Sequence, residues 1–221
     1  MAARTLLHYT RSEHRITDMT TPTLRTGSRQ IRAQYTADSL IVYQAFSAEI
    51  ANAALRAQTF TSPFRLNRMT WIKPSFLWMM YRSGCGTRPG QDRILAVEIT
   101  RQGFEWALSH SCLSRYDPAA YSTEREWREL LATSPVRIQW DPDRDLLLRP
   151  QSARAIQVGL AGEAVLLYVS SWIKSIRDVT TDANTIRTLV EAERLGDAQT
   201  RLPKETIYAL PNHIRRSIGA D

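Results

Sequence analysis

Residues 68–84 read RMTWIKPSFLWMMYRSG, and this stretch decides the fold. An extended piece ends near Ile72, and a helix is predicted to begin at Pro74, because proline suits the first helical position. The helix runs to about Arg82 and stops at Gly84, since glycine readily adopts the left-handed conformation that follows a helix. Apolar side chains surround nearly the whole helix, which predicts a central position.

Segments with regular apolar spacing lie on both sides of this helix. Val136, Ile138 and Trp140 alternate with polar residues, which predicts a strand with one buried face, followed by a turn over residues 141–145. Apolar residues spaced by three and four predict an amphipathic helix over residues 165–176. The other predicted strands are residues 30–35 and 40–46, which form a hairpin, and residues 94–100 and 153–160. The other predicted helices are residues 47–57, 102–109, 181–195 and one that starts at Thr123.

Strands and helices follow one another without strict alternation, and no internal repeat or low-complexity linker divides the chain. This order favours an α+β fold over a doubly wound α/β fold. We therefore predict a single domain over residues 29–217, with a mixed or antiparallel split sheet and helices packed on it. Residues 1–28 lack apolar periodicity and are predicted to be a disordered extension, with Met19 as a plausible true start.

The chain has 221 residues and a formal net charge of +7, and its 29 basic residues are 26 arginines and three lysines. One explanation is the codon preference of a GC-rich genome. The other is an anionic partner, because the guanidinium fork matches phosphate and carboxylate geometry. Charge by itself indicates steering and solubility rather than a specific ligand.

Several classes of protein are excluded by what the sequence lacks. No run of about 18 apolar residues is present, so no membrane-spanning helix is predicted. The four histidines are scattered without metal-ligand spacing, so no metal site is predicted. No phosphate-binding loop, dinucleotide fingerprint or nucleophile-elbow serine occurs either. Cys85 and Cys112 form neither a disulfide framework nor a metal pattern, which favours a reducing, cytoplasmic location.

The start of the Pro74 helix is the first candidate site. Its unpaired N–H groups and positive dipole suit an anion, and the basic side chains just before it add charge. Lys73 is one of three lysines, so arginine codon preference does not explain it, and a buried lysine can act as a base. The alternative is that the basic residues pair with buried acids while the aromatic residues fill the core. The candidate residues here are Arg68, Thr70, Trp71, Lys73 and Ser75.

Polar residues in the middle of predicted strands form the second candidate set. Buried polar groups must be paired, so such residues imply an internal network or a ligand pocket. Glu98 lies inside a well-defined predicted strand and is a candidate acid–base or ribose-binding group, the alternative being exposure on the wet face of a sheet. Arg154 opens a strand and is a candidate ligand for an anion. The set comprises Arg32, Tyr43, Gln44, Glu98, Arg154 and Gln157.

Four shorter motifs accompany the 68–84 stretch in order: IRAQY at 31–35, VYQA at 42–45, QWDP at 139–142 and RAIQVGL at 154–160. Together they resemble the family called domain of unknown function 4291, over about residues 29–217. The resemblance implies membership of that fold and carries no activity to transfer. Cys85 departs from the pattern, because the family is expected to have tryptophan there, and this implies looser packing beside the glycine loop after the helix.

Two functions from different classes fit these residues. The first is an enzyme for a phosphate-bearing, nucleotide-type substrate, with the basic residues on the phosphate, Tyr43 or Trp71 stacked on a base, and Glu98 moving a proton. A narrower version is an ADP-ribosyltransferase-like protein that uses NAD, by analogy in the order of elements. The second is a non-catalytic module that binds RNA or DNA. A concave pocket favours the enzyme, and an open arginine stripe favours the module.

Overall fold

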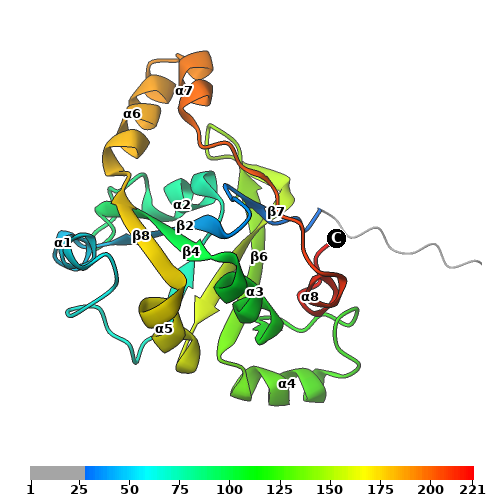
Figure 1. The fold of residues 1–221 in the computed structure, drawn as a ribbon. Helices are drawn as coiled ribbons and strands as arrows, with labels where there is room; N and C mark the ends of the chain where they lie inside the picture. Colours follow the sequence, from blue (N-terminus) through cyan, green and yellow to red (C-terminus); the bar gives the residue numbers. More distant parts are fainter. Residues whose placement is uncertain (1–27) are drawn as a thin grey trace, which may run out of the picture.

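The computed structural model describes residues 28–221, so the predicted start at Met19 and nearly all of the predicted extension lie outside the described residues. Two β-sheets occupy the centre of the molecule. Helices α6 (Thr180–Glu191) and α7 (Leu195–Arg201) form one end, and α4 (Glu124–Thr133) lies at the opposite end (Figure 1).

A three-stranded antiparallel sheet takes its strands from distant parts of the chain. Its order is β2 (Ser39–Phe46), β4 (Arg93–Thr100) and β8 (Ile173–Asp178), with β4 in the centre. The central strand reads RILAVEIT and is buried on both faces, so its apolar residues run almost continuously rather than alternating with polar ones. Leu95 and its alternate neighbours therefore face one core, while Ile94 faces another.

A four-stranded sheet lies beside the first. Its order is β3 (Thr70–Ile72), β7 (Pro150–Leu160), β6 (Val136–Arg144) and β5 (Ser111–Leu113). The β5–β6 pair is parallel and the other pairs are antiparallel. The two sheets confirm an α+β domain with mixed and antiparallel pairing.

The main core fills the space between the inner faces of the two sheets. Apolar side chains at alternate strand positions point into it, because successive strand residues face opposite sides. Three helical segments cover this core: α1 (Ala48–Ala57), α3 (Arg101–Ser109) and the segment formed by α5 (Glu163–Leu167) with the π-helical turn η1 (Tyr168–Trp172). A second core lies on the other face of the three-stranded sheet, where α2 (Phe76–Ser83) and α6 pack.

Helix α2 confirms most of the prediction made for residues 68–84. Ser75 is the N-cap, its Oγ accepting a hydrogen bond from the N–H of Trp78 at 3.3 Å, so the helix begins at Phe76 and not at Pro74. Gly84 ends the helix with a φ of 60°, and its N–H bonds to the preceding turn. Five of the eight helical residues are buried, in agreement with a central position.

The C-terminal strap, residues 202–211, runs from α7 toward α8 (Asn212–Ser217) along one side of the molecule (Figure 1). Its strand β9 (Thr206–Ile207) pairs with β1 (Arg32–Ala33). Tyr208 attaches the strap to α3 through hydrogen bonds to Glu105 and Arg101.

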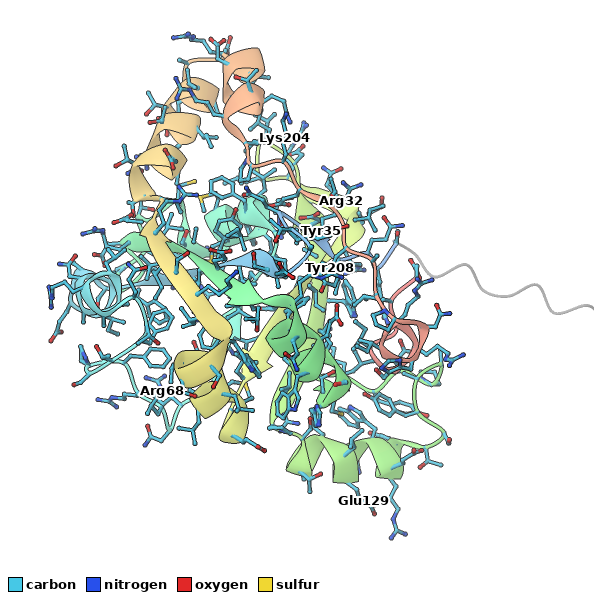
Figure 2. All side chains as sticks on the ribbon, viewed as in Figure 1. Arg32, Tyr35, Arg68, Glu129, Lys204 and Tyr208 are labelled. Atoms are coloured by element: carbon cyan, nitrogen blue, oxygen red, sulfur yellow. The ribbon has the colours of Figure 1, made fainter. Side chains whose placement is uncertain are left out.

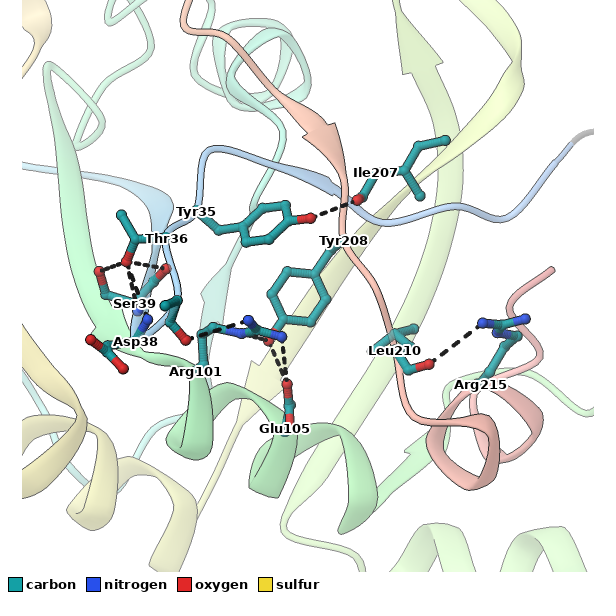
Figure 3. Close-up of polar contacts among 11 residues, drawn as sticks. Tyr35, Thr36, Asp38, Ser39, Arg101, Glu105, Ile207, Tyr208, Leu210 and Arg215 are labelled. Atoms are coloured by element: carbon teal, nitrogen blue, oxygen red, sulfur yellow. Dashed lines mark hydrogen bonds and ion pairs between the residues drawn. The ribbon is translucent and has the colours of Figure 1, made fainter.

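The ring of Tyr208 lies between the first residues of the domain and α3 (Figure 3). Its hydroxyl donates to Glu105 at 2.7 Å and accepts from Arg101 at 2.9 Å, and the Arg101 guanidinium lies 4.8 Å from the ring centre. Tyr35 packs edge-on against Tyr208, with ring centres 5.0 Å apart. These contacts fix the position of the strap relative to α3 and to Tyr35.

The helix predicted over residues 165–176 is the largest error in the sequence interpretation. The chain is helical only to Trp172, and residues 173–178 form β8, which pairs with β4 from Ile173–Ile99 to Asp178–Leu95. Without β8 the edge of β4 would expose unpaired main-chain groups next to a buried face. Tertiary pairing therefore overrides the helical spacing of the apolar residues.

Three further predictions about elements are wrong. Residues 30–35 do not form a hairpin strand with 40–46, because β1 pairs with β9 and only a Tyr35–Leu40 bridge remains. Residues 141–144 belong to β6 rather than to a turn. The helix predicted over 181–195 ends at Glu191, and Gly196 lies inside α7 instead of ending a helix.

Candidate functional site

A gap between β2 and β3 is the central feature of the candidate site. Within residues 28–221 a single main-chain pair, Tyr43–Lys73, joins the two strands, and beyond it they part. The main-chain N–H and C=O groups of successive strand residues point to opposite edges of the strand. Two residues beyond the Tyr43–Lys73 pair, the main-chain groups of Ala45 and Trp71 therefore face this gap. The split therefore opens a polar space directly beside Lys73.

This space, here called the Lys73 hollow, has a volume of about 480 Å³. That volume lies within the range of roughly 300–1,000 Å³ typical of ligand pockets. Its walls come from the end of β2, from β3, from α2 and from the facing positions of β6 and β7. The polar residues that line it are Gln44, Thr70, Lys73, Arg82, Gln91, Gln139 and Gln157.

Lys73 is 5% exposed, and its Nζ makes one hydrogen bond, at 3.4 Å to the carbonyl oxygen of Trp71. Burial lowers the pKa of Lys73, the nearby Arg82 guanidinium adds to this shift and Asp141 opposes it, and the resulting pKa is about 7. Burial is the condition under which the sequence analysis considers Lys73 as a base. No ion pair of Lys73 with an acid forms within residues 28–221, although Asp141 lies near enough to act on its pKa.

Arg82 lies in the same hollow on the last turn of α2. Its guanidinium bonds to Gln91 Oε1 at 3.4 Å, and no carboxylate pairs with it in the described part of the chain. The sequence analysis missed Arg82 as a site residue, although it lies in the decisive stretch nine positions after Lys73. Two basic groups thus share one hollow without a paired acid.

Gln44 is fixed by a buried relay of side chains. The hydroxyl of Tyr168 donates to Gln44 Oε1 at 2.7 Å, and Gln44 Nε2 donates to Thr70 Oγ1 at 2.7 Å. Burial raises the pKa of Tyr168, so its hydroxyl keeps the proton that this relay needs. Gln44 and Thr70 were predicted site residues, and the structure brings both to the hollow.

Asp141 lies behind the hollow with both of its carboxylate oxygens engaged. Gln139 Nε2 donates to Oδ1 at 2.8 Å, and Gln157 Nε2 donates to Oδ2 at 2.7 Å. Gln157 was a predicted site residue. The sequence analysis predicts a turn at Asp141. In the structure β6 continues through this residue, and its period-two alternation places Asp141 on the same face of the strand as Gln139.

The start of α2 does not offer an open anion site. Glu205 of the C-terminal strap accepts a hydrogen bond from the N–H of Phe76 at 2.7 Å, and Ser75 donates to Asp143 at 3.2 Å. Burial and the neighbouring Asp143 raise the pKa of Glu205 to about 8. The favourable position at the helix dipole is therefore occupied by the carboxyl group of Glu205, and Ser75 bonds to Asp143 and does not line the hollow.

Tyr43 and Glu98 also lie away from the hollow. The Tyr43 ring points to the opposite side of β2 from Gln44 and packs edge-on against Phe76, with ring centres 5.3 Å apart, so it is not available to stack on a base. Glu98 accepts hydrogen bonds from Ser39 at 2.6 Å and Ser175 at 2.9 Å, which lower its pKa. The structure does not bring Glu98 to Lys73.

The predicted arginine ligands are separated from one another. Arg32 is exposed beside the C-terminal strap, whereas Arg68 lies at a different edge of the molecule (Figure 2). Arg154 lines a hollow of about 600 Å³ with Arg29 and Arg115, near the end of β5. Of the predicted basic residues, only Lys73 lies in the Lys73 hollow.

Trp71 forms part of one wall of the hollow and is half-buried. It lies opposite Gly159 of β7, and a Cβ on Gly159 would lie 3.0 Å from the indole ring. Glycine at position 159 therefore lets the indole lie flat against the sheet. Trp71 is the aromatic side chain that the structure leaves beside Lys73.

No group of three or more His, Cys, Asp or Glu residues able to hold a metal ion occurs in the part of the chain that the structure describes. No helix among residues 28–221 has the length and apolar character needed to cross a membrane.

The fold and the hollow define an α+β protein with a buried lysine at the gap of a split sheet. The family model described as Domain of unknown function (DUF4291) matches residues 30–208, and the chain belongs to this family. The search of curated proteins gave no match.

Proposed function

We propose that the protein is an enzyme that acts on a phosphate-bearing, nucleotide-type substrate bound in the Lys73 hollow. One observation carries this proposal: Lys73 and Arg82 share a hollow without a paired carboxylate in residues 28–221. Like charges at close range are unfavourable, and burial adds to the cost for Lys73. A buried ionisable group with a strongly shifted pKa, as Lys73 is, is typical of functional sites, and a bound anion relieves its repulsion from the exposed Arg82.

A phosphate group between the two side chains gives each a charge-assisted hydrogen bond. The negative charge also raises the pKa of Lys73, so binding near pH 7 is accompanied by uptake of a proton on Nζ. The resulting ammonium group stabilises charge that develops on the substrate, and it can return the proton in the reaction. Lys73 is thus proposed as the acid–base residue and Arg82 as the phosphate ligand.

The remaining walls suit a nucleoside. The half-buried Trp71 provides a ring for stacking, and the amides of Gln139 and Gln157 provide hydrogen-bonding groups on a rigid support. Both amides are oriented by Asp141, so they are positioned before a ligand arrives. We do not assign a role to Glu98, because its carboxylate is bound by two serines at another place on β4.

A ligand screen by thermal shift tests the proposal with adenosine monophosphate, NAD and a short single-stranded RNA. A bound ligand raises Tm in a concentration-dependent way, because it stabilises only the folded state. We expect a mononucleotide to raise the Tm of the wild type and to have no effect on Lys73→Met. Lys174→Met is the matched control, since Lys174 is exposed and far from the hollow in sequence.

Two outcomes would contradict the proposal. In one, no nucleotide raises Tm at millimolar concentration. In the other, RNA alone raises Tm, with a steep salt dependence and an equal effect in Lys73→Met, which is the behaviour of a nucleic-acid-binding module.

A further inference from the structure

A second hollow of about 450 Å³ adjoins the Lys73 hollow. Its floor is aromatic: Phe46 and Phe64 are half-buried, and their ring centres lie 5.8 Å apart in an edge-on arrangement. Phe64 in turn stacks on the buried Phe60, with ring centres 4.7 Å apart. This packing holds the floor rigid, so its exposed ring surface is available for contact with a flat apolar group.

The two hollows are contiguous. Phe46, Met69 and Thr70 line both of them. Phe46 ends β2 and Thr70 begins β3, so the second hollow lies at the mouth of the same gap that holds Lys73. Met69 is 36% exposed at this boundary, and its unbranched side chain can change rotamer to admit a ligand.

The rim of the second hollow is basic. Arg65 and Arg68 both line it, both are exposed, and neither forms an ion pair within the described residues. Glu49 is the acidic residue on this rim. Arg68 lies at the surface in Figure 2, where its side chain is exposed to solvent. An aromatic floor with a guanidinium rim suits a nucleobase that carries a phosphate.

We propose that the ligand has two halves, one in each hollow, and is therefore a dinucleotide. One half binds at Lys73 and Arg82, the linking phosphates cross the boundary at Met69, and the other base lies on Phe46 and Phe64. Arg68 binds the phosphate of this second half. This inference rests on the proposed function of the Lys73 hollow and specifies its substrate class.

A polynucleotide is the less favoured occupant. Binding of a single strand needs a basic track that continues with stacking residues along several nucleotides. Beyond Arg65 and Arg68 the residues that line the second hollow are apolar, neutral or acidic, so its basic character ends there. Two hollows of ligand size correspond to two nucleotides rather than to a longer chain.

The test measures Kd by titration calorimetry for adenosine monophosphate, diadenosine diphosphate and a single-stranded RNA hexamer. We expect Arg68→Ala to raise the Kd of the dinucleotide by about tenfold or more, because the change removes a charge-assisted hydrogen bond. The Kd of the mononucleotide should stay unchanged. Met69→Trp, which fills the boundary, should give the same pattern. Arg201→Ala on α7 is the control, since Arg201 is exposed and unpaired among the described residues.

The two proposals fail in different ways. If Arg68→Ala and Met69→Trp leave dinucleotide binding unchanged while the mononucleotide still binds in a Lys73-dependent way, the two-part ligand is wrong and the function of the Lys73 hollow survives. A loss of RNA binding without a loss of dinucleotide binding also overturns the two-part ligand, in favour of a polymer. If Lys73→Met leaves mononucleotide and dinucleotide binding intact, the proposed function itself is wrong.

Discussion

Tyr43 and Lys73 pair through two main-chain hydrogen bonds, 2.7 Å from Tyr43 N to Lys73 O and 3.2 Å from Lys73 N to Tyr43 O. This pair joins the two sheets and fixes the Lys73 backbone at the point where β2 and β3 separate. The Lys73 side chain is consequently buried at the gap rather than free to reach solvent.

Replacing Lys73 by methionine should stabilise the protein. Lowering the pKa of a lysine from 10.5 to about 7 corresponds to on the order of 4 kcal/mol at pH 7. A methionine of similar length avoids most of that cost, so the free energy of unfolding should rise by about 2 kcal/mol, and Tm by about 5 °C. Differential scanning calorimetry measures both, and a fall in Tm would mean that Lys73 has a structural role.

The protonation of Lys73 should be visible directly, because the chain has three lysines. Lysine-selective labelling and NMR should show one Nζ signal that titrates with the low pKa of about 7. Lys73→Met should remove the low signal. Three signals that all titrate above pH 10 would contradict the electrostatics described for the hollow.

The lowered pKa of Lys73 also makes ligand binding depend on pH. An anion beside Nζ binds best when Lys73 is protonated, so affinity for inorganic phosphate or adenosine monophosphate should fall as pH rises through about 7. For folding the sign is opposite: between about 7 and 10.5 the unfolded chain binds more protons, so stability from this group rises with pH. Calorimetric titrations between pH 6 and 9 should show the fall in affinity, and a flat profile would contradict it.

Glu205 should make stability fall as pH rises. Its pKa is raised from 4.5 to about 8, so the stability it contributes is fully present below about pH 4.5 and is lost as pH rises through about 8. Glu205→Gln keeps an acceptor for the Phe76 N–H and removes the titration, so the decline of unfolding free energy between pH 5 and 8 should become shallower. Urea denaturation measures this slope. Glu129→Gln, an exposed change on α4, should leave it as in the wild type.

The substitution Gly103→Ala has opposite expected effects on helix propensity and on core packing. Gly103 is the third residue of α3, and an alanine there should stabilise an isolated helix by up to about 1 kcal/mol. In the fold, however, a Cβ on Gly103 would lie 2.3 Å from the Trp172 ring, so Gly103→Ala should destabilise the protein by about 2 kcal/mol or more. Gly196→Ala in α7 is the matched control, because its Cβ meets nothing within 4 Å and should stabilise. Equal effects of the two changes on Tm would contradict this account.

Local patterns predicted much of the fold. The C-cap of α2, the strand around residues 94–100 and the alternation in β6 were predicted from local residues alone, because each depends on residues close in sequence. The helix predicted over residues 165–176 failed where a long-range partner mattered. Ile173 and Ile176 fit a helical stripe as well as a strand, and only the exposed edge of β4 decides between them.

The candidate site shows the same division. The apolar and aromatic residues around Lys73 predict, over a few positions, that its segment lies in the interior. The groups that surround Lys73 depend on distant segments: Arg82 and Gln157 line the same hollow, while Glu205 occupies the helix start instead of a substrate anion. The physical reason is that strand register and strand order between distant segments set which side chains face one gap, and no local spacing encodes that pairing.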